Sequence, residues 1–174
     1  MKKIILGSIA LSALLVANEA MIKKGNAASD ALLQKLGSNL TEQMQKNGPI
    51  AAVDFCAKEA NKLTEAVSQE HGLSIKRVSD KTRNPDNQAT KQEISIMDEY
   101  RADIAAKKEL KPKLVNNTYY RPLLMAKDAC IVCHGDIDSD SPLAKAIGSN
   151  YPADKATGYK MGELRALISV TMPQ

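Results

Sequence analysis

Residues 130–134 read Cys-Ile-Val-Cys-His, a spacing that restricts what the surrounding chain can form. Two thiols three residues apart lie on the same side of a helical turn, and the imidazole that follows projects beside them. C-x-x-C-H is the attachment motif of c-type haem, in which the thiols bond to the vinyl groups and the histidine binds the iron. We therefore predict one covalently attached haem, bonded to Cys130 and Cys133, with His134 as its proximal axial ligand.

Two other interpretations of these cysteines fit the sequence less well. A structural zinc site takes four ligands, and the whole chain has only three Cys and two His to supply them, so such a site is barely feasible. A thioredoxin-like redox pair belongs to a βαβ pattern, which the flanking sequence lacks. It also leaves His134 without a role, so haem attachment remains the better prediction.

The N-terminus has the pattern of a secretory signal peptide. Three residues with two lysines precede an uncharged, apolar run from Ile4 to Ala17. This run is shorter than the ~20 residues of a membrane-spanning helix and fits the ~7–15 residues of a secretory apolar segment. We expect a signal peptide at residues 1–17, cleaved between residues 17 and 28, and a single domain over residues 18–174. An uncleaved N-terminal anchor is the alternative.

We expect the protein to be exported to the periplasm and not to be stably inserted in a membrane after cleavage. Its charge and cysteine content exclude further classes of protein. The net charge of +4 is small and dispersed, which does not favour nucleic acid as a partner. An odd number of cysteines in an oxidising compartment disfavours a structural disulfide framework. The chain shows no catalytic constellation beyond the haem motif, so we do not expect an enzyme.

The hydrophobic pattern predicts an α+β fold. Helical periodicity covers residues 28–46 and 49–69, which are separated by a break at Asn47-Gly48-Pro49. A capping box at Thr90–Glu93 opens another helix. Further elements are expected as strands over 73–78 and 114–120, a helical turn over 127–134, a turn of helix over 143–147, and two strands within 158–172. The sum is one domain of helices and a small antiparallel sheet.

The second axial ligand of the iron is not determined by spacing. Cys56 is an unpaired thiol on the inward face of a predicted helix, although a free Cys is commonly just a small buried hydrophobe. His71 precedes Gly72 at a helix end, where an exposed turn residue is expected. Met125 and Met161 carry thioethers, and no spacing rule selects either one.

Basic side chains near the first predicted strand are candidates to pair with the haem propionates, because guanidinium and carboxylate groups match in geometry. These are Arg77, Lys81 and Arg83. A solvated basic surface would give the same pattern, and the sequence does not separate the two.

Four blocks of the chain resemble the PAS-like haem-c family, also called Tll-like. They are residues 48–56, 75–87, 130–135 and 151–170. The blocks follow the family's order and cover nearly the whole chain after residue 17. The departures are modest: Glu163 stands where Asp is usual, Ala166 where Gly is common, and residues 76–82 diverge.

The resemblance implies a PAS-like antiparallel sheet flanked by N-terminal and interleaved helices. It also implies a His/Cys-ligated haem with Cys56 as the distal ligand, and a low reduction potential because thiolate favours ferric iron. Family members occur as exported cytochromes and as sensor parts of membrane signalling proteins. The implied function is redox or ligand sensing or electron transfer, with a redox partner protein or a membrane signalling protein as partner. A conventional electron-transfer cytochrome c with a Met or His distal ligand is the alternative.

Overall fold

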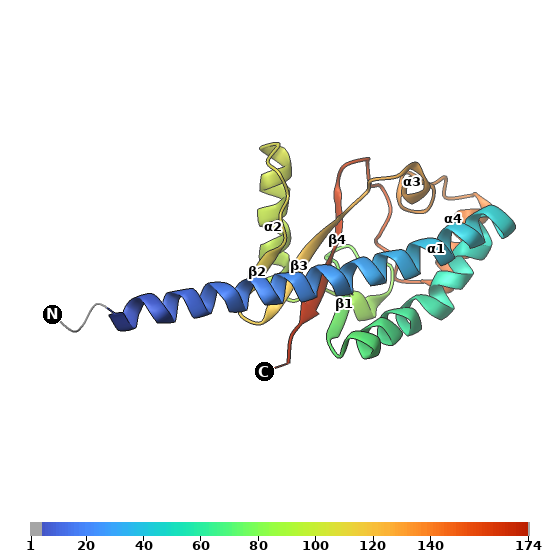
Figure 1. Cartoon of the computed structure of the whole chain (residues 1–174). Coiled ribbons are helices and arrows are strands. Elements are labelled where there is room, and N and C mark those ends of the chain that lie inside the picture. Colours follow the sequence, from blue (N-terminus) through green and yellow to red (C-terminus); the bar gives the residue numbers. More distant parts are fainter. Residues whose placement is uncertain (1–4, 174) are drawn as a thin grey trace.

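A long N-terminal helix, α1 (Ile5–His71), bends back on itself at Gly48 (Figure 1). The computed structural model describes the backbone of residues 5–173 and the side chains of residues 16–173. Gly48 has φ 80° and ψ 179°, a conformation that is essentially restricted to glycine. Pro49 follows in the first turn after the bend, where its missing N–H is not needed. The predicted break is confirmed, but the first helix begins at Ile5 rather than at residue 28.

The predicted signal peptide lies partly outside the described residues. Nothing is described for residues 1–4, and only the helical backbone is described for residues 5–15. Of the helices that the structure does describe, none is both long and apolar enough to cross a membrane. The signal peptide and its cleavage remain predictions.

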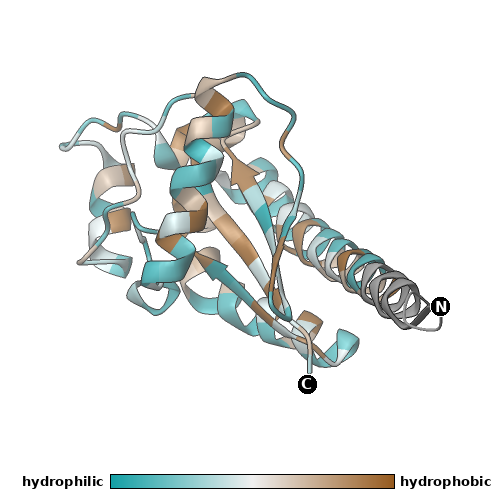
Figure 2. Ribbon diagram, turned by 90° about the vertical axis from the view of Figure 1, so that its left-hand side faces the viewer, coloured by the Kyte–Doolittle hydropathy of each residue, from teal (hydrophilic) through white to brown (hydrophobic). Residues whose placement is uncertain are grey.

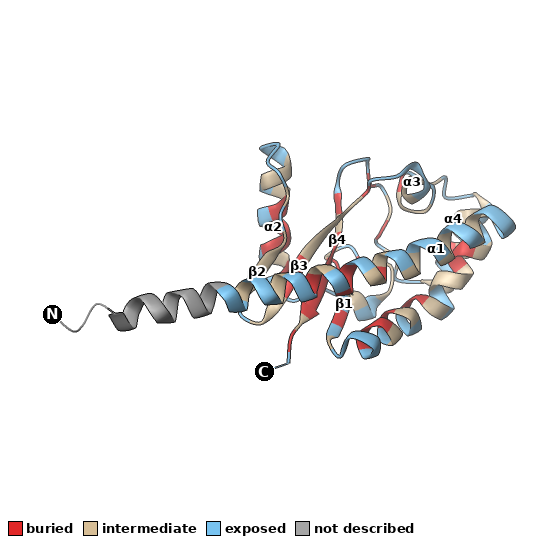
Figure 3. Cartoon of the chain, viewed as in Figure 1, coloured by how far each residue is buried: buried red, intermediate tan, exposed pale blue. Residues whose placement is uncertain are grey.

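The centre of the molecule is a four-stranded antiparallel sheet in the order β1-β4-β3-β2. β4 lies inside the sheet and pairs with β1 on one side and β3 on the other. Figure 3 shows buried residues concentrated on the strands and on the helix sides facing them, and Figure 2 shows hydrophobic residues on the same strands. The strands are β1 (Ser74–Val78), β2 (Lys113–Val115), β3 (Thr118–Leu124) and β4 (Leu164–Thr171).

Helices cover both faces of the sheet because successive strand residues point to opposite sides. Tyr119 and Ile168 pack with α1 residues in one core cluster. Tyr120 and Leu167 pack with α2 (Lys91–Ala105) in another. The predicted capping box of α2 is present, with Thr90 and Glu93 bonded reciprocally. A 3-10 turn (Pro85–Asn87) and two short helices, α3 (Asp128–His134) and α4 (Pro142–Asn150), complete the described chain. The α+β prediction is confirmed.

Two of the predicted strand assignments are wrong. The single strand expected over residues 114–120 is a hairpin, β2 and β3, because Asn116 takes a left-handed conformation (φ 57°) that Asn tolerates. The two strands expected over 158–172 are one strand, β4, preceded by turns. Gly158 and Gly162, both with positive φ, lie in those turns.

Candidate functional site

A cavity of about 310 Å³ brings together all four predicted site residues: Cys56, Cys130, Cys133 and His134. Its walls come from both segments of α1, from β1 and the loop after it, from α3 and from β4. One wall is apolar, built mainly from leucines of α1 before the bend, and the other carries arginine and amide side chains. Within the described residues, no group of three or more His, Cys, Asp or Glu side chains is placed to hold a metal ion.

The short helix α3 presents the C-x-x-C-H motif to this cavity. Helical spacing directs Cys130 and Cys133 into the cavity, while Val132 between them points outward and is 41% exposed. Gly135 ends the helix, and a Cβ at this position would lie 2.6 Å from the side chain of Ile131. Glycine is therefore needed where the chain leaves α3. All three cysteines of the protein are free thiols in this structure.

His134 is held as a neutral imidazole with a free lone pair. Its Nδ1 lies 2.7 Å from the carbonyl oxygen of Ala156, which can only accept, so Nδ1 carries the proton and Nε2 does not. Burial, followed by the positive charges of Arg165 and Arg83, lowers the pKa of His134 to about 3. The part of the His134 ring that is not covered by other residues lines the cavity. A neutral imidazole whose second nitrogen is fixed by a backbone carbonyl is the usual form of a histidine metal ligand.

A buried ion pair fixes the backbone around His134. Arg83 Nε lies 3.1 Å from Asp154 Oδ1, and the two side chains are 11% and 10% exposed. Arg83 also donates through Nη2 to the carbonyl oxygen of Cys133. Tyr159 N donates to the carbonyl oxygen of His134 at 2.9 Å. The segment 154–159 therefore holds the C-terminal end of α3.

Cys56 reaches the cavity from α1, after the bend. The prediction that it lies on the inward face holds in part: Val53 and Ala60 on the same stripe are buried, and Cys56 is half-buried and faces the cavity. Burial raises the pKa of the Cys56 thiol, and the positive charge of Arg77 opposes that effect. A thiol is thus available on α1, whereas His134 belongs to α3.

The other three candidates for the second ligand are placed less well. His71 is exposed at the end of α1, and Met161 is 50% exposed beside a different surface depression. Met125 is buried and lines the cavity, but it packs with Ala156 and Tyr159. Ala156 accepts the hydrogen bond of His134, so Met125 lies on the same side of the cavity as His134.

Sequence reasoning did not give roles to Tyr151, Asp154 and Arg165. Tyr151 and Arg165 line the cavity, and Asp154 pairs with Arg83 behind its wall. One indication was available, because Arg165 is the only charged residue in the mainly apolar run 164–170. Lys81, a predicted propionate partner, instead donates to the carbonyl oxygen of Thr157.

An antiparallel sheet flanked by helices, with a cavity between the sheet and the N-terminal helix, defines a PAS-like α+β domain. The model of the Tll0287-like family matches residues 10–173, and the chain belongs to this family. Among solved structures it is similar to the crystal structure of the cyanobacterial heme-protein Tll0287, with a TM-score of 0.63 and 21% identity over 85% of this chain and 91% of that chain. A comparison with curated proteins gave no match. The predicted family and the predicted PAS-like fold are confirmed.

Proposed function

We propose that the protein is an exported c-type haem protein with one covalent haem, acting in redox or ligand sensing or in electron transfer. The observation that carries the proposal is the arrangement of α3, which directs Cys130, Cys133 and His134 into one cavity faced by Cys56. The relationship to the heme-protein Tll0287 supports haem as the ligand. The periplasm is the compartment expected from the N-terminal sequence.

The cavity suits haem in its chemistry. A haem has a flat apolar ring and two carboxylates, and the cavity has an apolar wall of leucines and a polar wall that includes three arginines. Two free thiols on one helical turn are available for the vinyl groups. His134 offers an unprotonated nitrogen for the iron, and the bound iron would supply reversible one-electron chemistry.

Cys56 is the proposed distal ligand. It approaches from α1 after the bend, whereas His134 approaches from α3. A thiolate ligand favours ferric iron, and loss of such a ligand on reduction would open a binding position for a gas or another small molecule. With this ligand the protein could sense redox state or a small ligand, and its partner would be a redox protein or a membrane signalling protein.

The alternative remains a conventional electron-transfer cytochrome with a Met or His distal ligand. Two Met residues line the cavity: Met125, which lies on the side of His134, and Met44, which belongs to α1 before the bend. His71 does not line the cavity. The placements of Met125 and His71 favour Cys56 over these two residues, and Met44→Leu belongs in the spectroscopic comparison because Met44 also lines the cavity.

The test is to express the full chain in a host that attaches c-type haem and to isolate it from the periplasm. We expect a haem stain that survives denaturing electrophoresis, and a pyridine haemochrome of the two-thioether type. Cys130→Ala/Cys133→Ala should lose the stain. Wild-type protein that is exported without covalent haem would exclude the proposal.

The distal ligand is tested by optical and EPR spectra of the ferric protein. Cys56→Ser should lose the low-spin thiolate signature, whereas the control Met125→Leu should keep it. Carbon monoxide binding after reduction should then identify a ligand position that opens. The reverse result, with the spectrum changed only by Met125→Leu, would support the conventional cytochrome.

A further inference from the structure

The charges around the cavity are unbalanced. Three arginines line it, Arg77, Arg83 and Arg165, and none of the lining residues is Asp or Glu. Arg83 is neutralised by Asp154 behind the wall. Across residues 16–173, neither Arg77 nor Arg165 forms an ion pair. Two guanidinium groups therefore face the cavity without a carboxylate partner.

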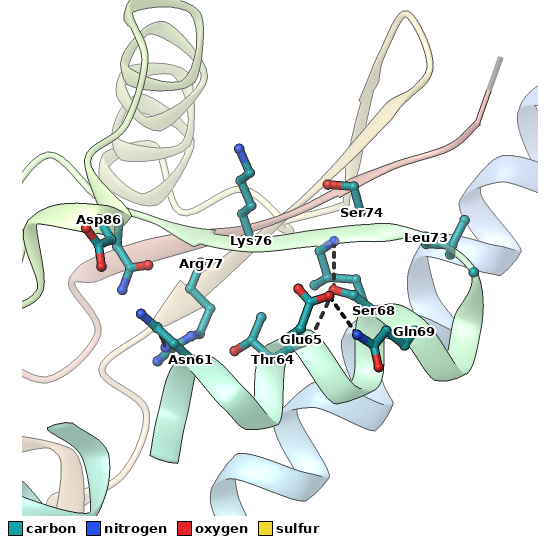
Figure 4. A pocket seen from close by; sticks show the side chains of 13 residues that line it. Asn61, Thr64, Glu65, Ser68, Gln69, Leu73, Ser74, Lys76, Arg77 and Asp86 are labelled. Carbon is teal, nitrogen blue, oxygen red and sulfur yellow. Dashed lines mark hydrogen bonds between the residues drawn. The ribbon is translucent and has the colours of Figure 1, made fainter. Parts of the chain in front are cut away.

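One nitrogen of the Arg77 guanidinium also lacks a hydrogen-bond acceptor. Its Nη2 donates to Asn61 Oδ1 at 2.9 Å, but its buried Nε has no partner. Figure 4 shows Arg77 extending from β1 toward Asn61 on α1, at the edge of a polar groove. Asn61, Arg77 and Asn87 line both this groove and the cavity. A buried donor without an acceptor is costly, so a ligand acceptor is expected at this edge.

The guanidinium of Arg165 is fixed by hydrogen bonds from one of its nitrogens, Nη1. Its Nη1 donates to Ser79 Oγ at 3.0 Å and to the carbonyl oxygen of Lys81 at 3.1 Å. Its guanidinium lies 5.5 Å from the ring centroid of Tyr159. No hydrogen bond from Nη2 is found among the described residues. This is a fixed positive charge in a strand that has no other charged residue.

A ligand that satisfies both arginines carries two carboxylates on an apolar body. We infer that Arg77 and Arg165 each bind one carboxylate of such a ligand, namely the two propionates of the haem. The inference rests on the proposed function and names the residues that would orient the ring. The charged and titratable neighbours are Cys56 and Tyr151 beside Arg77, and His134, Tyr159, Arg83 and Asp154 beside Arg165.

The experiment uses holoprotein carrying Arg77→Gln, Arg165→Gln or both, with Arg101→Gln as control. Arg101 is a half-buried arginine that pairs with Asp80 and Asp98 and does not line the cavity. Resonance Raman spectra report hydrogen bonding to the propionates through their bending modes. We expect each cavity variant to weaken one propionate hydrogen bond and the double variant to weaken both, with no change in the control.

A second readout is the pH dependence of the reduction potential. A carboxylate beside a guanidinium has its pKa lowered by about 1–3 units, so loss of the arginine should move the propionate titration upward by a similar amount. Arg77→Lys and Arg165→Lys should restore most of the wild-type profile, which a purely structural role would not do.

The two proposals fail in different ways. Wild-type protein without covalent haem would exclude the proposed function. Wild-type and variant proteins that all carry haem, with unchanged Raman bands and unchanged pH profiles, would overturn the assignment of the arginines alone.

Discussion

His134 Nδ1 lies 2.7 Å from the carbonyl oxygen of Ala156, and this contact joins the proposed proximal ligand to a loop from the C-terminal part of the chain. The loop is itself fixed by charge: Asp154 Oδ1 accepts from Ala156 N at 3.0 Å and also pairs with Arg83. The orientation of the imidazole thus depends on an ion pair between residues that are distant in sequence.

Asp154→Asn tests this dependence. The substitution keeps the shape of the side chain but leaves Arg83 as a buried, uncompensated charge, so we expect a loss of about 3–5 kcal/mol in the free energy of unfolding. Chemical denaturation measures it. As a control, Glu42→Gln removes the exposed pair with Lys46 and should leave stability unchanged within error. Equal effects of the two substitutions would show that the buried pair does not hold the loop.

Gly25→Ala tests the packing of α1 on the sheet. A Cβ at Gly25 would lie 2.2 Å from Tyr119 Cγ, a buried ring whose hydroxyl donates to Asn26. Overpacking of this kind costs about 1–3 kcal/mol. Gly37→Ala on the same helix meets nothing within 4 Å and should be neutral or stabilising, because Ala favours helix.

The Gly25→Ala variant also tests where the predicted signal peptide is cleaved. Gly25 and Asn26 contact Tyr119 of the sheet, and we therefore expect the predicted cleavage to fall near residues 17–20 rather than near residue 28. The intact mass of the exported protein should place its N-terminus before Gly25. A mature chain starting after Asn26, with a stability that Gly25→Ala does not alter, would contradict this expectation.

Tyr100→Phe should change how stability depends on alkaline pH. Burial raises the pKa of Tyr100 above its usual value, while its hydroxyl donates to the carbonyl oxygens of Lys111 and Tyr120. Above about pH 10 the unfolded tyrosine ionises and the folded one does not, so the stability present below that pH is lost as pH rises. We expect a shallower loss in the variant as the pH rises above about 10, and lower stability at pH 7. Denaturation series at several pH values decide it, and parallel curves for the two proteins would contradict the assignment.

The local signals in the sequence were sufficient where one residue type dictates one geometry. Gly48-Pro49 gave the bend, Thr90 and Glu93 gave the start of α2, and the spacing of Cys130 and Cys133 gave the face of α3. Each of these three features depends on contacts within a few residues, so the local sequence pattern is enough to predict it.

Features that depend on distant contacts were not predictable in this way. The register of β3 is fixed by its pairing with β4, which lies far along the chain at Leu164–Thr171 and which the pattern of residues 114–120 does not show. The polar wall of the cavity combines Arg77, Tyr151 and Arg165, which are far apart in sequence and meet only in the fold. The family resemblance, rather than spacing, singled out Cys56.

Gly48→Ala connects the bend of α1 to the proposed distal ligand. The backbone at Gly48 has φ 80°, and a Cβ there would meet nothing within 4 Å, so the penalty is conformational rather than steric crowding by neighbours. A residue held in this region costs about 1–3 kcal/mol. The chain can relieve that cost by opening the bend, which would move the segment that carries Cys56. We therefore expect lower stability together with partial loss of the thiolate signature in the ferric spectrum. Gly148→Ala, in α4 and also without neighbours within 4 Å, should leave the spectrum unchanged and the stability unchanged or higher, because Ala favours helix. A destabilised Gly48→Ala protein with an unaltered spectrum would show that the position of Cys56 does not depend on the bend.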